Sequence, residues 1–593
     1  MRYATLWTLV RLPFLSAADL AELHGISSRA ARAQLARLCQ VEIAAYVERP
    51  EAREHLYYLT ATGIKAAARS AREDPDELTA RYGLGERALL RRLPGLSRLV
   101  VGRSVLIALH RALRAAGGAL EDWRAWPVPW RAPQGPRWPA LSMDGEATLG
   151  WPEEGGRCRI GYLWDGDEMV PPEVLHERLG WLEALRQSPA STPPSTARVP
   201  PVLVVTADAA RIPAGYRPGV LWTTTAAIAA YGPLEAAWWG STVRGEAQPL
   251  RSALATIVHR PCVPTPGPAA AFPVRGAAVP GLAERARAVR DGTARAGDEG
   301  LGLLTFALPP RALDLLALVG AHPLFSAAHL ARACPLARSD RGALLALLCR
   351  HELLMVWRAP EVAGERRYVL TPRGLRVLAL RAGVTPQVYR RLYGVLESSV
   401  TAARKGLPLL QRTLAHTDAI HECYLALRQG AEDRGGTLWW RGDWACRRTY
   451  LDGERLCTVR PDAEGGYRDA RGWLSFYLEL DRGTTSHRKV DRKLGHYYAY
   501  RATTTVTVLL VTLGSGRCRQ VLHRVEALAV ERGTAPLDVR ATTLDKLRTQ
   551  GPWASIWRTL YGTCGPLALV PVTAADAVVV LGAPSKTNAG KDR

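Results

Sequence analysis

The stretch FYLELDRGTTSHRKVDRKLGHYY, which runs from Phe476 to Tyr498, decides how the second half of the chain folds. Its first six residues predict a strand that carries Glu479 and Asp481 on the same face, about 7 Å apart. After the turn RGTT, Lys493 and Tyr497 lie four residues apart and therefore share one face of a predicted helix. The stretch thus predicts a strand, a turn and a helix that bring carboxylates and a lysine into the same region.

A third carboxylate precedes this strand. The stretch TVRPDAEGGYRDARGWLSFYLELD predicts strand, turn and strand, with Asp462 at the end of the first strand, so that three carboxylates would converge across the hairpin. Hydrolysis of a phosphodiester with Mg²⁺ requires oxygen ligands for the ion and a cation near the phosphate. Asp462 and Glu479 are the predicted ligands. Asp481 is a further ligand or a supporting group, and Lys493 is the predicted cation.

Two other interpretations of these residues stay open. The site could bind a metal ion without cleaving DNA, or the carboxylates could form a structural cluster in which Asp481 and Arg482 cap the next helix or pair with Lys493. Tyr497 is a nucleophile in principle, although tyrosines in such a helix more often pack or stack. No two histidines are separated by one residue, so the sequence does not support a relaxase of the paired-histidine type.

Length, charge and cysteine pattern define the class of protein. The 593 residues, 47% of them hydrophobic, are enough for about three to five domains. The net charge of +23 favours a polyanionic partner, usually nucleic acid, although the excess of arginine is also what a GC-rich coding sequence produces. The 10 cysteines form no CxxC pair, which argues against a zinc module. Without a long apolar run or a secretion signal, we expect a soluble cytoplasmic protein with no membrane partner.

The sequence repeats itself over a long period. The stretches LSAADLAELHGISSRAARAQLARL and FSAAHLARACPLARSDRGALLALL align Ser16 with Ser326, and the alignment continues to Gly63 and Gly374. Near the ends of the two halves, VLWTTTAAIAAYGPLEAAWW and VRATTLDKLRTQGPWASIWR share Thr-Thr, Gly-Pro and Trp. Self-similarity of this kind predicts two similar architectures in tandem.

Each half begins with a helix, a short helix, a turn, a third helix and two strands, which is typical of a winged helix-turn-helix. In the first copy, Ser27 is the predicted N-cap of a third helix that ends near Leu38. The third helix of such a domain enters the major groove and wing arginines contact phosphates, although winged helices also serve as protein-docking modules. The predicted DNA-binding residues are Arg29, Arg32, Arg37, Arg49 and Arg53 in the first copy, and Arg338, Arg341, Arg366 and Arg367 in the second.

The predicted fold class is α+β, with two tandem units that each consist of a winged helix-turn-helix followed by a mixed sheet flanked by helices. The predicted segments are a winged helix at 1–66, a degenerate sheet domain at 67–258, a Pro/Gly/Ala-rich linker at 259–305, a second winged helix at 306–382, a second sheet domain at 383–575 and a tail at 576–593.

The motifs of the second half resemble the PD-(D/E)xK nuclease fold. Together with the winged helix and the segment LAHTDAIHECYLAL from Leu414, they resemble the plasmid replication-relaxation family over about residues 306–560. The nuclease motif has a lysine two residues after the glutamate, where this chain has Asp481, and Lys493 is the candidate replacement. The resemblance implies Mg²⁺ as cofactor, Asp462 and Glu479 as metal ligands, and a catalytic set of Asp462, Glu479, Asp481, Lys493 and Tyr497.

The first half aligns as a degenerate copy of this site. Asp144 aligns with Asp462 and Asp165 with Asp481, but the other positions are replaced, by Leu163 for Glu479, Glu177 for Lys493, Trp181 for Tyr497 and Gly102 for His416. Any chemistry is therefore expected in the second half. His416 itself is expected to pair with a neighbour such as Asp418.

Three functional hypotheses follow. The first is a DNA-processing enzyme of a bacterial plasmid or other mobile element, acting in replication, DNA relaxation or transfer, with metal-dependent nicking by the second half. The second is a non-catalytic accessory factor that binds double-stranded DNA and recruits a relaxase or replication protein. The third is a transcriptional regulator of the element. DNA binding is common to all three.

Overall fold

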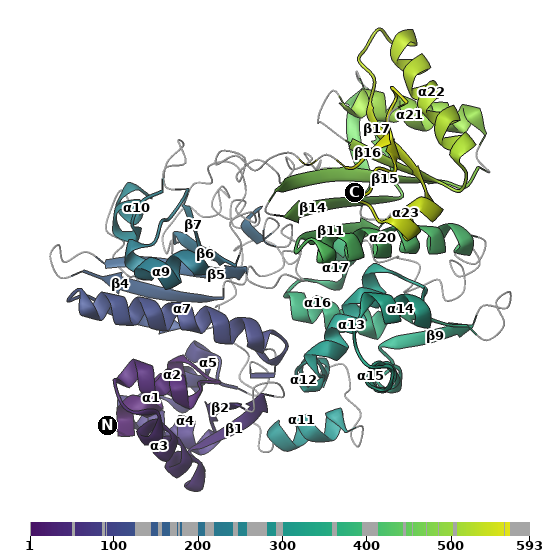
Figure 1. Cartoon of the computed structure of the whole chain (residues 1–593). Helices are drawn as coiled ribbons and strands as arrows, with labels where there is room; N and C mark the ends of the chain where they lie inside the picture. The colour runs from purple at the N-terminus through teal and green to yellow at the C-terminus, as the bar shows by residue number, and fades with distance from the viewer. Residues whose placement is uncertain are drawn as a thin grey trace. The chain divides into compact units, whose positions relative to one another are not determined.

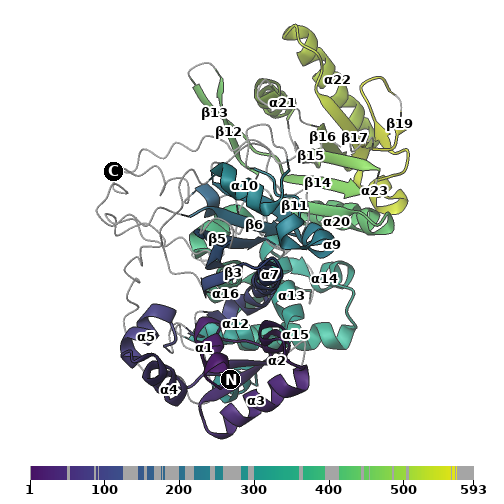
Figure 2. The same cartoon turned by 90° about the vertical axis from the view of Figure 1, so that its left-hand side faces the viewer.

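The structure is a computed structural model of the whole chain (Figures 1 and 2). It describes residues 2–49, 54–85, 89–90, 92–124, 144–151, 157–165, 175, 178–180, 200–207, 219–240, 247–257, 282–291, 300–358, 365–393, 413–442, 446–452, 455–469, 471–483, 486–501, 507–562, 564–567 and 569. The chain divides into two compact units, the first mainly Met1–Pro310 and the second mainly Arg311–Ala379 with Thr385–Ala577. Each unit contains helices and a mixed sheet, so the predicted α+β class is confirmed in this general form.

Unit 1 begins with a helical subdomain and continues into a five-stranded sheet of order β3-β4-β5-β6-β7. Its helices and strands are α1 Arg2–Arg11, α2 Ala17–His24, α3 Ser28–Gln40, β1 Ala44–Arg49, β2 Glu54–Leu59, α4 Ala61–Ala71, α5 Pro75–Tyr82, η1 Leu93–Gly95, α7 Leu96–Ala115, β3 Ala119–Arg124, β4 Gly145–Gly150, β5 Arg157–Asp165, β6 Val202–Thr206, β7 Val220–Thr224, α9 Thr225–Glu235, α10 Leu250–Ile257, α11 Leu282–Arg290 and α12 Leu301–Ala307.

Unit 2 has the same order of parts and a seven-stranded sheet, β11-β14-β15-β16-β17-β18-β19. Its elements are α13 Pro310–Ala321, β8 Phe325–Ser326, α14 Ala327–Ala333, α15 Arg338–Arg350, β9 Leu354–Arg358, β10 Arg366–Leu370, α16 Pro372–Ala382, α17 Pro386–Tyr393, α20 Leu414–Asp433, β11 Thr437–Gly442, β12 Arg448–Asp452, β13 Arg455–Val459, β14 Ala463–Asp469, β15 Gly472–Asp481, α21 His487–Arg501, β16 Thr507–Thr512, α22 Ser515–Glu531, β17 Asp538–Thr543, α23 Leu544–Gln550, β18 Trp557–Arg558 and β19 Cys564–Gly565.

Side-chain caps begin the first helices of unit 1. The hydroxyl of Ser16 accepts a hydrogen bond from the Asp19 amide, and the Asp19 carboxylate accepts one from the Ser16 amide, which forms a capping box. The Ser27 hydroxyl accepts from the Ala30 amide at the start of α3. The predicted third helix with Ser27 as its N-cap is therefore confirmed. Strands β1 and β2 then pair as an antiparallel hairpin.

Local details of this subdomain recur in unit 2. A capping box begins α14 at Ser326, as one begins α2 at Ser16. Thr60 and Thr371 each donate to the carbonyl of the residue that precedes the hairpin and accept from the amide three residues later. Two non-glycine residues with positive φ in unit 1 have counterparts in unit 2, with Phe14 at 67° and Leu324 at 69°, and Glu42 at 55° and Glu352 at 57°. These positions are strained for non-glycine residues, so their recurrence is a specific structural likeness.

The sheet of unit 2 separates two apolar cores. Phe476, Leu478 and Leu480 of β15 pack on the face covered by α20 and α23, whereas Tyr477 packs on the face covered by α21 and α22. This confirms the predicted alternation along the strand. Figure 1 shows α20 along the β11-β14-β15 part of the sheet. One prediction is wrong, because Asp462 does not end a strand but directly precedes β14, which turns into β15 after Asp469.

The two sheets share their direction changes. In each, the first three strands are antiparallel and the next two pairings are parallel. After the last parallel strand, Gly232 and Gly551 both adopt positive φ, at 75° and 78°. The indole of a fully buried tryptophan then donates to a proline carbonyl, from Trp238 in unit 1 and Trp557 in unit 2.

Among the helices of the described residues, no single one is long and apolar enough to cross a bilayer. Only the bent pair of α12 and α13 reaches that length and composition together.

The close approach at Gly374 predicts a stability effect. A Cβ at this position would overlap the carbonyl oxygen of Leu353, whereas a Cβ at Gly342, also in a helix of unit 2, would meet nothing within 4 Å. Gly374→Ala should therefore lower the free energy of unfolding by about 1–3 kcal/mol. Gly342→Ala should leave it unchanged or raise it by up to about 1 kcal/mol, because alanine is the better helix former. Urea unfolding of the two variants measures the difference, and equal stabilities would contradict the packing described.

Candidate active site

Asp462 is fixed by the backbone of the neighbouring strand. Its amide donates to the Leu478 carbonyl at 3.0 Å, and its carboxylate accepts from the Leu480 amide at 2.8 Å. Glu479, the residue between these two, lies on β15, which pairs antiparallel with β14 and parallel with β16. These backbone contacts place the Asp462 carboxylate next to Glu479, near the carboxyl end of β15.

Lys493 of α21 joins the two carboxylates. Its ammonium contacts Oε2 of Glu479 and lies 3.7 Å from Oδ1 of Asp462. The side chain keeps 40% of its surface exposed, while those of Glu479 and Asp462 keep only 10% and 16%. One positive charge therefore lies between two nearly buried negative charges. Of the three side chains, that of Lys493 is the most exposed to solvent.

Two further side chains hold the carboxylates in place. The buried Tyr497, one helical turn beyond Lys493, donates its hydroxyl to Oε1 of Glu479 at 2.5 Å. His416, near the start of α20, lies with Nε2 3.4 Å from Oδ1 of Asp462. The expectation that His416 pairs with Asp418 is wrong, because its contact is with a residue far along the chain. The only signal in the sequence was the alignment of His416 with Gly102, which shows that the fold does not need this side chain.

Burial and charge shift the pKa values of these groups in different directions. Burial raises the pKa of Glu479 to about 7, with a further rise from Asp462 and an opposing effect of Lys493. For Asp462, burial is outweighed by the charge of Lys493 and by hydrogen bonds from His416 and the Leu480 amide, so its pKa is lowered. Burial, and then the charge of Glu479, raise the pKa of Tyr497 well above its usual range, so it remains a hydrogen-bond donor.

The Asp481 carboxylate has two partners outside the cluster of Asp462, Glu479 and Lys493. Its Oδ2 accepts from Arg517 of α22 at 2.8 Å, and its Oδ1 accepts from the Gly483 amide at 2.8 Å. Asp481 thus stabilises the turn before α21 and pairs with Arg517, and its membership of the catalytic set stays a prediction. Arg517 gave no signal in the sequence.

The donor set of Asp462 and Glu479 fits a hard divalent cation. Both are carboxylates, the ligand type that Mg²⁺ prefers, and both already converge on one ammonium. Two carboxylates face a single lysine here, so one negative charge is left uncompensated when both are ionised.

In the described residues of unit 1, the aligned place has similar backbone contacts but different side chains. The Asp144 carboxylate accepts from the Trp164 amide at 2.9 Å, as Asp462 does from Leu480. Leu163, in the place of Glu479, is buried in an apolar cluster. Arg178 lies 3.4 Å from the Asp144 carboxylate. The positions aligned with Lys493 and Tyr497 lie outside the described residues.

Most of the described arginines predicted to bind DNA lie on the surface. Arg29, Arg32 and Arg37 of α3 are exposed, as are Arg338 and Arg366. Arg341 is half-buried and donates to the Leu336 carbonyl at 3.0 Å. Arg53 and the side chain of Arg49 lie outside the described part of the chain.

The prediction that Arg367 binds DNA is wrong. Its side chain is only 3% exposed and donates to both oxygens of Asp418, at 2.6 and 2.8 Å, and to Glu365. A guanidinium enclosed in this way cannot reach a phosphate. Arg367 instead joins the hairpin β9–β10 to α20.

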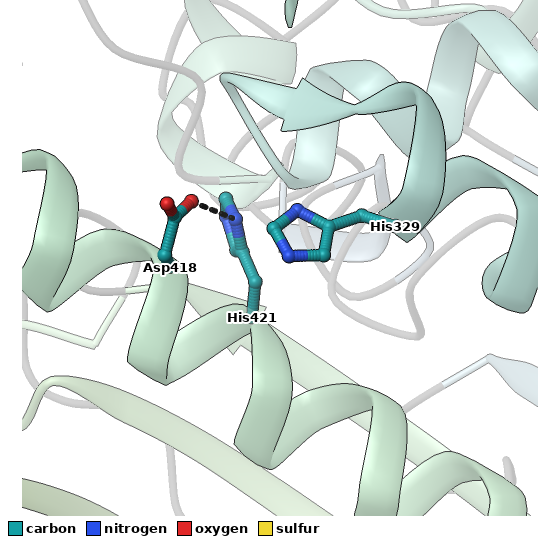
Figure 3. A group of neighbouring side chains, drawn as sticks. All are labelled: His329, Asp418 and His421. Atoms are coloured by element: carbon teal, nitrogen blue, oxygen red, sulfur yellow. Dashed lines mark ion pairs between the residues drawn. The ribbon is translucent and has the colours of Figure 1, made fainter. Parts of the chain in front are cut away.

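A second polar cluster lies at the same joint, formed by His329, Asp418 and His421 (Figure 3). Asp418 and His421 lie on α20, and His329 lies on α14. The spacing of these residues would suit a metal ion, but the nearby carboxylates are already matched by arginines, Asp418 by Arg367 and the adjacent Glu422 by Arg332 and Arg548. We therefore interpret the cluster as packing between the two helices.

Comparison with known proteins supports one family. Residues 316–508 match the sequence model of the family described as Replication-relaxation. The match covers about a third of the chain and extends from α13 to the start of β16, so it includes Asp462, Glu479 and Lys493. No curated protein and no solved structure matches the chain.

The raised pKa of Glu479 predicts a pH-dependent stability. Between about 4.5 and about 7 the unfolded chain loses this proton before the folded chain does, so ionisation of Glu479 lowers stability as pH rises. Glu479→Gln cannot ionise. Its stability relative to the parent should therefore increase across that window, by at most about 3 kcal/mol. Urea unfolding at both ends of the window measures this change. The exposed Glu526→Gln is the control, and a Glu479→Gln difference that is constant with pH would contradict the shift.

The Arg367–Asp418 pair predicts a large effect of a single truncation. Asp418→Ala leaves a buried guanidinium with only Glu365 and a carbonyl as partners, and should cost roughly 2–4 kcal/mol of stability. Asp433→Ala removes an exposed carboxylate from the same helix and should cost less than about 0.5 kcal/mol. Chemical denaturation of both variants tests the pair, and similar small losses would show that Arg367 does not depend on Asp418.

Proposed function

We propose that this protein binds DNA of a bacterial plasmid or other mobile element, acts in its replication, relaxation or transfer, and nicks DNA with Mg²⁺ through unit 2. The observation that carries the proposal is the convergence of Asp462, Glu479 and Lys493 on a mixed sheet, within the segment similar to the Replication-relaxation family. The net charge of +23 supports a polyanionic substrate.

The proposal includes a tandem origin for the two units. Each is a winged helix-turn-helix followed by a sheet of the PD-(D/E)xK nuclease type. Recurrent capping boxes, matched positive φ values and the matched Trp238 and Trp557 hydrogen bonds support this duplication. The exposed arginines of α3 support DNA contact by the first winged helix.

Each residue of the cluster has a role in this proposal. Asp462 and Glu479 would hold Mg²⁺, which supplies the positive charge that activates water and stabilises a phosphate under attack. Lys493 is exposed enough to turn from Glu479 toward a phosphate oxygen. Tyr497 and His416 orient the two carboxylates through their contacts. Unit 1 keeps the aspartates Asp144 and Asp165 but has no counterpart of Glu479 or Lys493, so it would hold DNA without cleaving it.

One observation favours a second candidate, a non-catalytic accessory factor or transcriptional regulator. The Lys493 ammonium already contacts Glu479, so the cluster has a partner for this carboxylate without any metal ion. In that case unit 2 would be a scaffold that recruits a relaxase or replication protein to double-stranded DNA.

Nicking of supercoiled plasmid separates the two candidates. The parent protein with Mg²⁺ should convert supercoils to nicked circles, whereas Glu479→Gln and Lys493→Ala should lose at least about 100-fold of the rate, since each removes a group that acts at the phosphate. Both variants should retain DNA binding in a mobility-shift assay. Lys546→Ala, which changes an exposed lysine of α23, is the matched control and should nick normally.

Two other results would reject nicking at Asp462, Glu479 and Lys493. Intact supercoils from a parent protein that still shifts the DNA, with Mg²⁺ or Mn²⁺ present, would reject nicking and favour the accessory role. Nicking that is equal in the parent and in Glu479→Gln would show that the activity arises elsewhere.

A further inference from the structure

Helix α15 differs from α3, its counterpart in unit 1, on the face that is exposed to solvent. The two helices are both 13 residues long, and each is followed by an antiparallel hairpin. An uncharged residue replaces each of the three exposed arginines of α3. In the alignment that pairs Ser16 with Ser326, these replacements are Ser339 for Arg29, Gly342 for Arg32 and Leu347 for Arg37. The exposed face of α15 therefore lacks the positive charges that support DNA contact by α3.

Small and apolar residues form this face of α15. Ala343 and Ala346 are exposed, and a Cβ at Gly342 would meet nothing within 4 Å, so the surface there is open. The adjoining strand β9, which packs beside α15, adds Met355 and Val356, whose exposed fractions are 37% and 40%. Because the side chains on the helix are short, a second helix can approach α15 closely here.

Opposite charges lie at the two ends of the same face. Asp340 is in the first turn of α15 and Arg350 is its last residue, about 15 Å away along the helix axis. Both side chains are exposed, and neither has an oppositely charged partner among the described residues. An antiparallel copy of α15 would place each Asp340 beside Arg350 of the other copy, and the two helices would cross between Ala343 and Ala346. The exposed charges of α3 are all positive, so two copies of α3 would repel each other instead.

We propose that two copies of this chain associate through α15, which packs antiparallel against α15 of the second copy, with Met355 and Val356 at the margin of the contact. The charge pattern selects this occupant, because the face is complementary to itself, whereas a nucleic acid would require positive charge. The contact does not use α3. The dimer would bring two copies of α3 and of the Asp462–Glu479 site to one DNA molecule. The inference goes beyond the proposed function and holds whether or not unit 2 nicks DNA.

Sedimentation equilibrium of the full chain tests the contact. The parent protein should form a dimer with a dissociation constant of about 1–100 μM, because a single pair of helices buries a small area. Ala346→Arg should weaken the dimer at least about tenfold, since the two introduced side chains meet at the crossing and repel each other. The position is exposed and arginine is a good helix former, so this variant should fold normally. Ala36→Arg, at the aligned exposed position of α3, is the matched control and should dimerise as the parent protein does.

Charge reversal tests whether the partner is a second copy of this chain. Asp340→Arg places two arginines together at each end of the contact, and Arg350→Asp places two aspartates there. Each variant alone should therefore dimerise at least about tenfold more weakly than the parent protein. An equimolar mixture of the two variants should regain the affinity of the parent protein, since each arginine of one variant then meets an aspartate of the other.

Each contrary result overturns the inference. A parent protein that stays monomeric over this concentration range shows that α15 does not join two copies. Dimerisation that survives Ala346→Arg, or that is lost equally in Ala36→Arg, shows that the contact lies elsewhere. A mixture of Asp340→Arg and Arg350→Asp that stays monomeric rejects the antiparallel pairing. None of these results decides whether unit 2 nicks DNA, which the plasmid assay measures separately.

Discussion

The hydrogen bond from the Leu480 amide to the Asp462 carboxylate fixes the geometry on which the site of unit 2 depends. It holds the residue before β14 against β15, so that Asp462 and Glu479 lie together near the carboxyl end of β15. A strand amide is a rigid donor, and the carboxylate that it holds cannot turn away from its neighbour. Like charges placed so close require a cation, and Lys493 of α21 provides one.

The two units share a backbone contact at this place but differ in the side chains around it. The amide-to-aspartate bond recurs in unit 1 at Trp164 and Asp144, so it belongs to the fold. The glutamate does not recur, because Leu163 is buried in its place, and Gly102 takes the position of His416. Among the described residues, Asp144 of unit 1 instead lies beside Arg178, so the two units differ in which ionic side chains surround this aspartate.

The sequence predicted the features that depend on local pattern. Alternation predicted the two faces of β15, and serine at Ser27 predicted the start of α3, since each follows from a few neighbouring residues. The limits of β14 were predicted wrongly, because Pro461 and Asp462 looked like the end of a strand when they precede one. The sequence did not predict the partners of the ionic side chains. Asp481 meets Arg517, His416 meets Asp462 and Arg367 meets Asp418 through packing of distant elements, which composition and spacing do not specify.

We propose that unit 2 holds one divalent cation at Asp462 and Glu479 and that Asp144, at the aligned place in unit 1, holds none. Titration of the full chain with Mn²⁺, followed by the loss of its free electron paramagnetic signal, measures this directly. We expect one saturable Mn²⁺ site, which Asp462→Asn should abolish and Asp144→Asn should leave unchanged. Absence of saturable binding, or equal loss in the two variants, would contradict it.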